Sequence, residues 1–463
     1  MNNVTSTPEL PKPVLNERTR LLLEGKIVPT LLKLSLPNTL YFVATLGLIM
    51  FDGLITSQLG LDALAGVVLV FPFVMALMHV SGSGVGGAVS AAVARALGSG
   101  ARERAAALAS HAILLAVGLT GIVMAVMLPF GEAIYAWMGA RGPMLEAALA
   151  YSNVVFGGAI AVCLFNILTS IARGTGNMAL PALVQVCVVA AHFVVSPLLV
   201  FGAGPLPGLG VVGAAAGFVV CYAAGCVWLL AYLCQSAAPV PLRISGAEFR
   251  TEHFSEILRV GVPGMLNVAA NNLSVVLMTS IAGRLGRDVQ IGYALAARLE
   301  HVIIPLAFVF GMSLVAMVGT NWGGRQYARA RRIAWTGGTM AGICCGLVGM
   351  GYAIRPDLWM DMFTDQPDLI KIGSLYLLVV GPTFALFGFG QALYFSRQGL
   401  GTPLPAVVAN LVRFGVTVGG SLIAIQWFDG EALSLFIAIA AGFVVYAILN
   451  AWILWRTGDP PAL

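Results

Sequence analysis

One acidic residue, Asp52, lies inside an apolar stretch in which a charge is costly. Residues 46–55 contain no other charged side chain, and an ionised carboxylate in a low-dielectric environment is expensive unless it binds a proton or a partner. The position therefore favours reversible proton binding. The alternative is an aspartate in the outer part of its segment that reaches water.

A histidine and a serine in a second apolar segment are the next candidates. His192 and Ser196 are four residues apart, which places them on one face of a helix. An imidazole that faces Asp52 could tune or share its proton. A lone histidine in such a segment can equally hydrogen-bond a neighbour without any further role, and both alternatives stay open.

The segments that carry these residues are predicted to be membrane helices. Of the 463 residues, 59% are hydrophobic and only 10% are charged, whereas soluble domains carry about 25% charged residues. A helical span needs roughly 20 apolar residues, and the sequence lacks the alternation in short blocks that marks an outer-membrane barrel. We therefore expect an all-α integral membrane protein with twelve spans, near 30–58, 63–97, 106–129, 146–172, 178–202, 209–235, 256–285, 289–322, 334–354, 368–396, 403–427 and 431–455.

The basic residues predict the orientation of these spans. With the N-terminus in the cytoplasm, eighteen Lys and Arg residues fall on the cytoplasmic side and five on the outer side. This asymmetry follows the positive-inside rule. We expect an inner-membrane protein with both termini in the cytoplasm, and the net charge of +5 reflects this topology rather than nucleic-acid binding.

The two halves of the chain repeat each other. An offset of 226 residues places Pro37 on Pro263 and Asp52 on Met278, and the run at 215–220 recurs unchanged at 440–445. Six spans per half make the halves parallel repeats around a central cleft, and the two prolines are predicted to kink the first helix of each half. The predicted division is a cytoplasmic segment 1–29, an N-lobe 30–235, a cytoplasmic linker 236–255, a C-lobe 256–455 and a cytoplasmic tail 456–463.

Several motifs, in their order and spacing, resemble those of the multidrug and toxic compound extrusion (MATE) family, and more closely its DinF-like branch. They are ARALGSG at 94–100, RGTGN at 173–177, PLLVFG at 197–202 and GVVGAA at 210–215. The similarity covers roughly residues 20–456. It implies a secondary antiporter, in which a proton or sodium ion enters while a bulky, lipophilic and often cationic compound leaves.

The resemblance also implies that an acid at the position of Asp52 couples the ion. The family usually has Asn and Asp where this chain has His192 and Ser196, so one ion ligand is missing here and proton coupling is favoured over sodium. Relatives outside this branch carry acids in the second lobe, where this chain has Asn271 and Asn272. Coupling through the C-lobe is therefore not expected.

Other residues are candidates for gating and for substrate contact. Arg298 and Glu300 resemble a family feature and are predicted to form either a gate or a structural pair. Aromatic and methionine side chains suit lipophilic cations. The candidate cavity residues are Phe42, Met50, Met75, Phe156, Phe165, Met265, Met278, Asn271, Asn272, Phe384 and Tyr394.

Competing functions differ in features of the sequence. A lipid-linked oligosaccharide flippase of the same superfamily usually has several cavity arginines, but only Arg298 and Arg413 are assigned to the membrane interior, since Arg95, Arg259 and Arg284 lie near the ends of their spans and count with the cytoplasmic or outer side. Neither a metal-ligand cluster nor a catalytic constellation is visible, so we expect no metal, no cofactor and no enzymatic activity. The predicted partners are protons, drug-like small molecules and the lipid bilayer, with a monomer as the functional unit.

Overall fold

The computed structural model describes residues 16–203, 206–235, 238–242, 250–427 and 431–458. Nearly all of this part of the chain is helical, which satisfies the backbone hydrogen bonds inside each segment, as a bilayer requires. Its N-terminal half contains α1 (Glu17–Glu24), α2 (Ile27–Ser57), α3 (Leu61–His79), the π-helix η1 (Val80–Val85), α4 (Gly86–Gly98), α5 (Arg102–Trp137), α6 (Gly142–Gly157), α7 (Ala159–Gly174), α8 (Ala179–Phe201), the short antiparallel strands β1 (Gly202–Ala203) and β2 (Leu206–Pro207), and α9 (Val211–Leu233).

The C-terminal half repeats this helical pattern. It contains α10 (Thr251–Arg284), α11 (Arg287–Ala297), α12 (Glu300–Gly323), α13 (Tyr327–Ile354), α14 (Asp357–Met360), α15 (Pro367–Val380), the 3-10 helix η2 (Gly381–Thr383), α16 (Phe384–Leu400), α17 (Leu404–Trp427) and α18 (Ala432–Trp455).

These helices confirm the predicted all-α membrane fold. In the described residues, eleven helices are long and apolar enough to span a membrane, and α6 with α7, bent by 48°, makes a twelfth. Several spans are composite: α3, η1 and α4 run on as one, because the glycine-rich stretch after His79 forms a π-helix and not a break. The helices α2 and α10 continue through Pro37 and Pro263.

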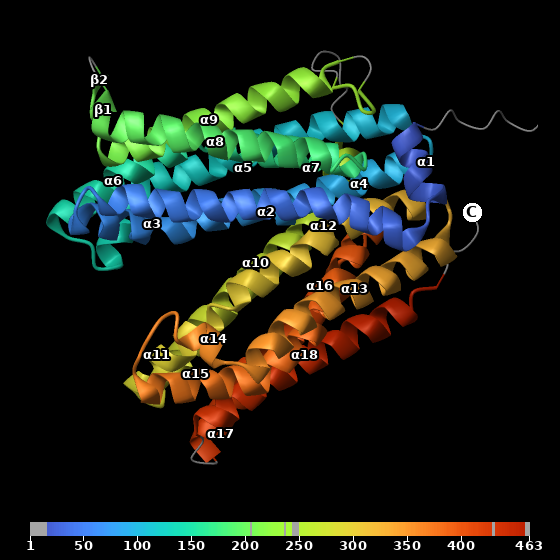
Figure 1. Cartoon of the computed structure of the whole chain (residues 1–463). Coiled ribbons are helices and arrows are strands. Elements are labelled where there is room, and N and C mark those ends of the chain that lie inside the picture. Colours follow the sequence, from blue (N-terminus) through green and yellow to red (C-terminus); the bar gives the residue numbers. More distant parts are fainter. Residues whose placement is uncertain (1–15, 204–205, 236–237, 243–249, 428–430, 459–463) are drawn as a thin grey trace, which may run out of the picture.

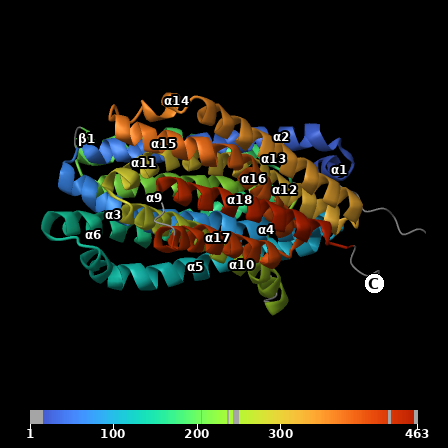
Figure 2. The ribbon, with the colours of Figure 1, turned by 90° about the horizontal axis from the view of Figure 1, so that it is seen from below.

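The helices form two lobes arranged as a V (Figure 1). The N-lobe contains α2 to α9 and the C-lobe α10 to α18, and the lobes meet at the end of the molecule where α1 begins and α18 ends. We call this the terminal end. The lobes separate toward the opposite end, where α3, α6, α11 and α15 lie. Figure 2 shows the same helices from below, with the C-lobe helices in front of the N-lobe.

Small residues bring the lobes together at the terminal end. A side chain at Gly98 would overlap the backbone of Thr320, and one at Gly323 would overlap the backbone of Arg95. Further along, an added Cβ at Gly264 would lie 3.1 Å from the Gly84 backbone. Close backbone contact through small residues is how membrane helices pack without a hydrophobic driving force.

Neutral hydrogen bonds join the lobes in the same region. The Asn38 amide of α2 donates to the Val309 carbonyl at 3.3 Å and to the Ser313 hydroxyl at 3.2 Å, both in α12. Ser35 donates to Ser313 at 3.2 Å. The Gln398 amide of α16 donates to the Ser83 carbonyl at 3.1 Å. The junction is therefore polar as well as closely packed.

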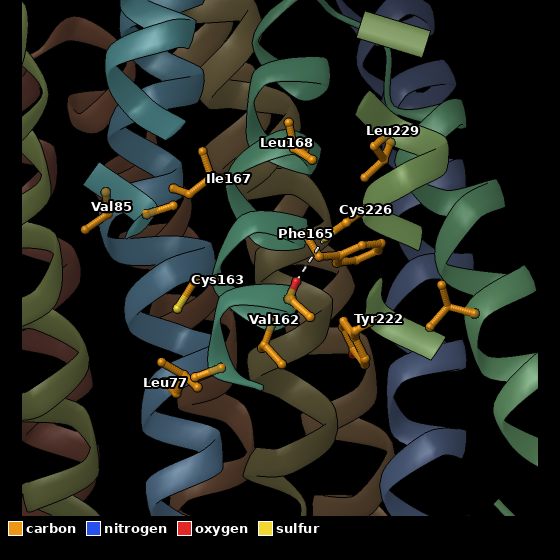
Figure 3. Close-up of a cluster of buried hydrophobic side chains, with 14 of the residues drawn as sticks. Leu77, Val85, Val162, Cys163, Phe165, Ile167, Leu168, Tyr222, Cys226 and Leu229 are labelled. Atoms are coloured by element: carbon orange, nitrogen blue, oxygen red, sulfur yellow. Dashed lines mark hydrogen bonds between the residues drawn. The ribbon is translucent and has the colours of Figure 1, made fainter. Parts of the chain in front are cut away.

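Two of the predicted cavity residues lie in the core of the N-lobe. Phe156 of α6 and Phe165 of α7 are 1% and 0% exposed, and Figure 3 shows Phe165 packed beside Tyr222 and Cys226. Both rings are buried within the lobe in this conformation, and their assignment to the substrate cavity stays a prediction.

Candidate functional site

The structure brings Asp52 of α2 and His192 of α8 into direct contact. His192 Nε2 lies 2.6 Å from Asp52 Oδ1, a short hydrogen bond. The His192 side chain is fully buried, whereas the Asp52 side chain is 19% exposed. The carboxylate is thus the accessible member of the pair, and the imidazole supports it from inside the lobe.

Neighbouring helices hold this pair in place. Phe51 and Phe218 meet the His192 ring edge-on, with ring centroids 6.1 and 6.5 Å away. Gly217 of α9 lets α8 approach, because a Cβ there would lie 3.1 Å from the Ser196 Cα. Aromatic rings and close backbone packing leave the imidazole little room to change its orientation.

Ser196 lies one helical turn beyond His192 and is completely buried. The Ser196 hydroxyl has no hydrogen-bond partner among the described residues. Together the three side chains provide a carboxylate, an imidazole and one unused hydroxyl. This set can bind or pass a proton, because both the carboxylate and the imidazole can carry it.

The equivalent site in the C-lobe keeps the serine but lacks the acid and the imidazole. Offsets of 226 and 225 residues place Met278 on Asp52, Thr417 on His192 and Ser421 on Ser196. The Ser421 hydroxyl approaches the Met278 sulfur at 3.9 Å. The same helix pair is therefore kept in both lobes, but only the N-lobe pair can exchange a proton.

A cavity opens in the C-lobe and reaches His79 and Ser83 of the N-lobe. Four predicted substrate residues line it, namely Asn271, Asn272, Met278 and Phe384. Aromatic residues that the sequence analysis did not select also line it: Tyr293, Phe308, Phe387 and Phe443. We call this the C-lobe cavity.

The other predicted cavity residues lie outside the C-lobe cavity. Phe42 packs edge-on against Phe308 across the two lobes, at a centroid distance of 6.1 Å, and Met50 is 61% exposed. Met75 and Met265 are half-buried. Tyr394 is 2% exposed and packs on Phe395 in a core cluster, and its assignment to a substrate cavity stays a prediction.

Arg298 and Glu300 do not form the predicted pair. The Glu300 carboxylate accepts a hydrogen bond from the Tyr376 hydroxyl at 2.6 Å, while the Arg298 guanidinium lies 5.2 Å from the centre of the Phe363 ring. Residues two apart point in different directions, and Arg298 lies in the break between α11, which ends at Ala297, and α12, which begins at Glu300. The structural pair is therefore wrong, and a gating role for either residue stays a prediction.

A polar network around Arg413 was not anticipated. Arg413 and Asn410 of α17 meet Asn271 and Asn267 of α10 in the lobe interior. The sequence spacing could have indicated that these side chains share helix faces. Asn267 and Asn271 are one turn apart, and Asn410 precedes Arg413 by three residues, all within apolar segments.

Comparisons with known proteins agree with this architecture. The MatE family model matches residues 37–198 and 263–423, one block in each lobe. The chain is 25% identical over 399 residues to a FAD transporter of Shewanella oneidensis, covering 85% of this chain and 86% of that protein. It is 26% identical over 414 residues to the multidrug export protein MepA of Staphylococcus aureus, covering 86% and 88%.

A solved structure shares the fold over almost the whole length. It is described as an outward-facing conformation of a multidrug resistance MATE family transporter of the MOP superfamily. The TM-score is 0.85 at 23% identity, with 96% of this chain and all of that chain covered. The two-lobed helical fold and the match of the family model to most of both lobes show that this multi-pass membrane protein belongs to the MatE family of transporters.

Proposed function

We propose that this chain is a proton-driven antiporter that exports lipophilic, mostly cationic organic compounds across the inner membrane. The observation that carries the proposal is the 2.6 Å contact between Asp52 and His192 within the spans of the N-lobe. Similarity to a multidrug export protein supports the substrate class.

The ligands around Asp52 favour a proton over a sodium ion. Sodium, like other hard cations, binds several oxygen ligands, but the close polar partner of the carboxylate is an imidazole nitrogen. Ser196 supplies a hydroxyl where relatives supply a second acid. A proton needs only the carboxylate and the imidazole, and both are present.

The proposed mechanism is alternating access between two lobes. We assign the terminal end to the cytoplasm, because the sequence concentrates its basic residues on that side. The lobes meet there and separate at the opposite end (Figure 1), so this conformation faces outward. Protonation of Asp52 would remove a charge from the N-lobe and so shift the balance between the outward-facing and inward-facing states.

The proposal is tested by comparing Asp52→Asn with the wild type. Both proteins are reconstituted in proteoliposomes with ethidium as the transported dye, and either a pH gradient or a sodium gradient is imposed. We expect a pH gradient alone to drive ethidium transport by the wild type, and Asp52→Asn to abolish it because an amide cannot bind the proton.

Asp62→Asn is the matched control, since Asp62 is an exposed acid at the start of α3. It should transport ethidium as the wild type does. Transport by Asp52→Asn at the wild-type rate would remove Asp52 from coupling. Transport driven by sodium without a pH gradient would overturn the choice of proton.

A further inference from the structure

Arg413 is a buried cation that has only neutral hydrogen-bond partners. Its side chain is 6% exposed. Nε donates to the Asn410 amide oxygen at 2.7 Å, and Nη2 donates to the Asn271 amide oxygen at 2.8 Å. The rings of Phe443 and Tyr446 lie 5.8 Å from the guanidinium carbon.

The amide network around Arg413 presents oxygens to the guanidinium. The Asn410 amide nitrogen donates to the oxygens of Asn267 and Asn271 at 2.8 and 3.1 Å, and this fixes the orientation of Asn410. No carboxylate lies within ion-pair distance of Arg413 in the described part of the chain. Glu300 attracts the guanidinium from beyond ion-pair distance. A buried charge that no carboxylate contacts directly is still costly, so the site has room for a closer anionic ligand.

One nitrogen of Arg413 is available to such a ligand. Nη1 makes no hydrogen bond within the described residues, yet it is not among the enclosed atoms that lack a partner. Arg413 lines the C-lobe cavity, and Nη1 is the nitrogen of its guanidinium that is neither bonded nor enclosed. The position is specific to this lobe, since an offset of 225 residues places Val188 there in the N-lobe.

The cavity wall defines the rest of the ligand. Phe308, Phe387 and Phe443 offer aromatic surfaces in the wall of the same cavity, and Phe443 is the one of the three whose ring lies next to the Arg413 guanidinium. Glu300 also lines the cavity, and its carboxylate opposes an anion. A ligand with an aromatic ring system and one anionic group can contact the rings and bring that group to the guanidinium.

We propose that the C-lobe cavity is a binding site for aromatic compounds that carry a phosphate or carboxylate group, with Arg413 as the residue that binds the anion. This inference rests on the proposed efflux function, because it adds a second class of exported compound. One relative of this chain is a FAD transporter, and FAD combines aromatic rings with phosphates.

The test compares two flavins that differ in one phosphate. Binding of riboflavin and flavin mononucleotide to the purified, detergent-solubilised protein is measured by quenching of flavin fluorescence. A hydrogen bond to a charged group justifies an expected preference of about tenfold or more for flavin mononucleotide. Arg413→Gln should bring the two affinities together, Arg413→Lys should keep most of the preference, and Glu300→Gln should increase it.

Arg298→Gln is the matched control, since Arg298 also lies in a span but sits on Phe363. It should leave the preference unchanged. Equal wild-type affinities for the two flavins would overturn the inference, and that comparison needs no variant to fold. A preference that survives in folded Arg413→Gln would overturn it as well. Ethidium transport, measured in parallel, separates the outcomes: its absence contradicts the efflux function, whereas its presence with equal flavin affinities contradicts only the anion site.

Discussion

Asn38→Leu should shift the protein away from the V-shaped conformation of Figure 1, which is outward-facing under the proposed topology. Asn38 is 1% exposed, and its amide makes two of the hydrogen bonds that join α2 to α12. Leucine is similar in size but cannot donate. Ser313 keeps a partner after the change, because its hydroxyl also donates to the carbonyl of Val309. The substitution therefore removes interlobe bonds without leaving a donor unpaired on α12.

The size of the shift follows from the two lost bonds. A neutral hydrogen bond contributes about 0.5–1.5 kcal/mol net, so the pair contributes about 1–3 kcal/mol. These bonds exist only where the lobes meet at the terminal end, so the loss falls on the outward-facing state alone. The ratio of outward-facing to inward-facing molecules should fall by roughly 5-fold to 150-fold.

Distances between spin labels measure this ratio directly. Labels at Leu61 of α3 and Leu358 of α14, which are 84% and 57% exposed, report the separation of the lobes at the open end. They are introduced into a background in which the seven native cysteines are replaced by alanine. We expect a new population at shorter distance in Asn38→Leu.

Asn450→Leu is the matched control for this experiment. Asn450 is also buried, but its amide donates to Tyr446 within α18 and joins no lobes. It should keep the wild-type distance distribution. The reasoning is refuted if Asn38→Leu leaves the distribution unchanged, or if Asn450→Leu shifts it equally.

Three further changes test other parts of the structure. His192→Phe removes the 2.6 Å hydrogen bond to Asp52. Because hydrogen bonds to charged groups contribute about 1.5–3 kcal/mol, the initial rate of pH-driven ethidium transport should fall at least about tenfold. An unchanged rate would contradict a role for the pair. Gly98→Val places a side chain against the Thr320 backbone, so the spin labels at Leu61 and Leu358 should report loss of the outward-facing population. An unaltered population would mean that the helices at the junction can move apart enough to accommodate the side chain. Phe165→Ala opens a cavity in the N-lobe core and should cost about 3–5 kcal/mol, seen as a lower midpoint in thermal unfolding, whereas Phe71→Ala, at a 39% exposed position, should change the midpoint little.

The spans were predictable because apolar length is a local property of the sequence. The bilayer imposes it on each segment separately, and the predicted spans correspond to helices or helix pairs. The short helix α1 was missed because its eight residues are mostly polar or charged. The two-lobed arrangement followed from the internal repeat, which is a property of the whole chain.

Contacts between side chains were predictable only in part. Asp52 and His192 are 140 residues apart, and their meeting was an open alternative that only three-dimensional packing could decide. Phe156 and Phe165 show the limit of composition: an aromatic residue in a span can face the cleft, the lipid or the lobe core, and hydropathy is the same in each case. The Arg413 network depends on four polar side chains from two helices and so could not be derived from either helix alone.

The contacts of the junction can be compared with the energy that the proposed proton gradient would supply. Arg104 meets Glu256 at 2.8 Å, but the Arg104 side chain is 54% exposed, where an ion pair contributes only about 0–1 kcal/mol. Arg95 meets the same carboxylate at 3.2 Å and is only 15% exposed, so solvent screens this second pair less. The remaining interlobe bonds, such as that of Asn38, are neutral and of similar worth. Moving one charge across 100 mV supplies about 2.3 kcal/mol. The glycine contacts and neutral bonds of the junction can therefore be opened by the proposed entry of a small number of protons, and the part-buried pair of Arg95 with Glu256 is a further contact that this opening must break.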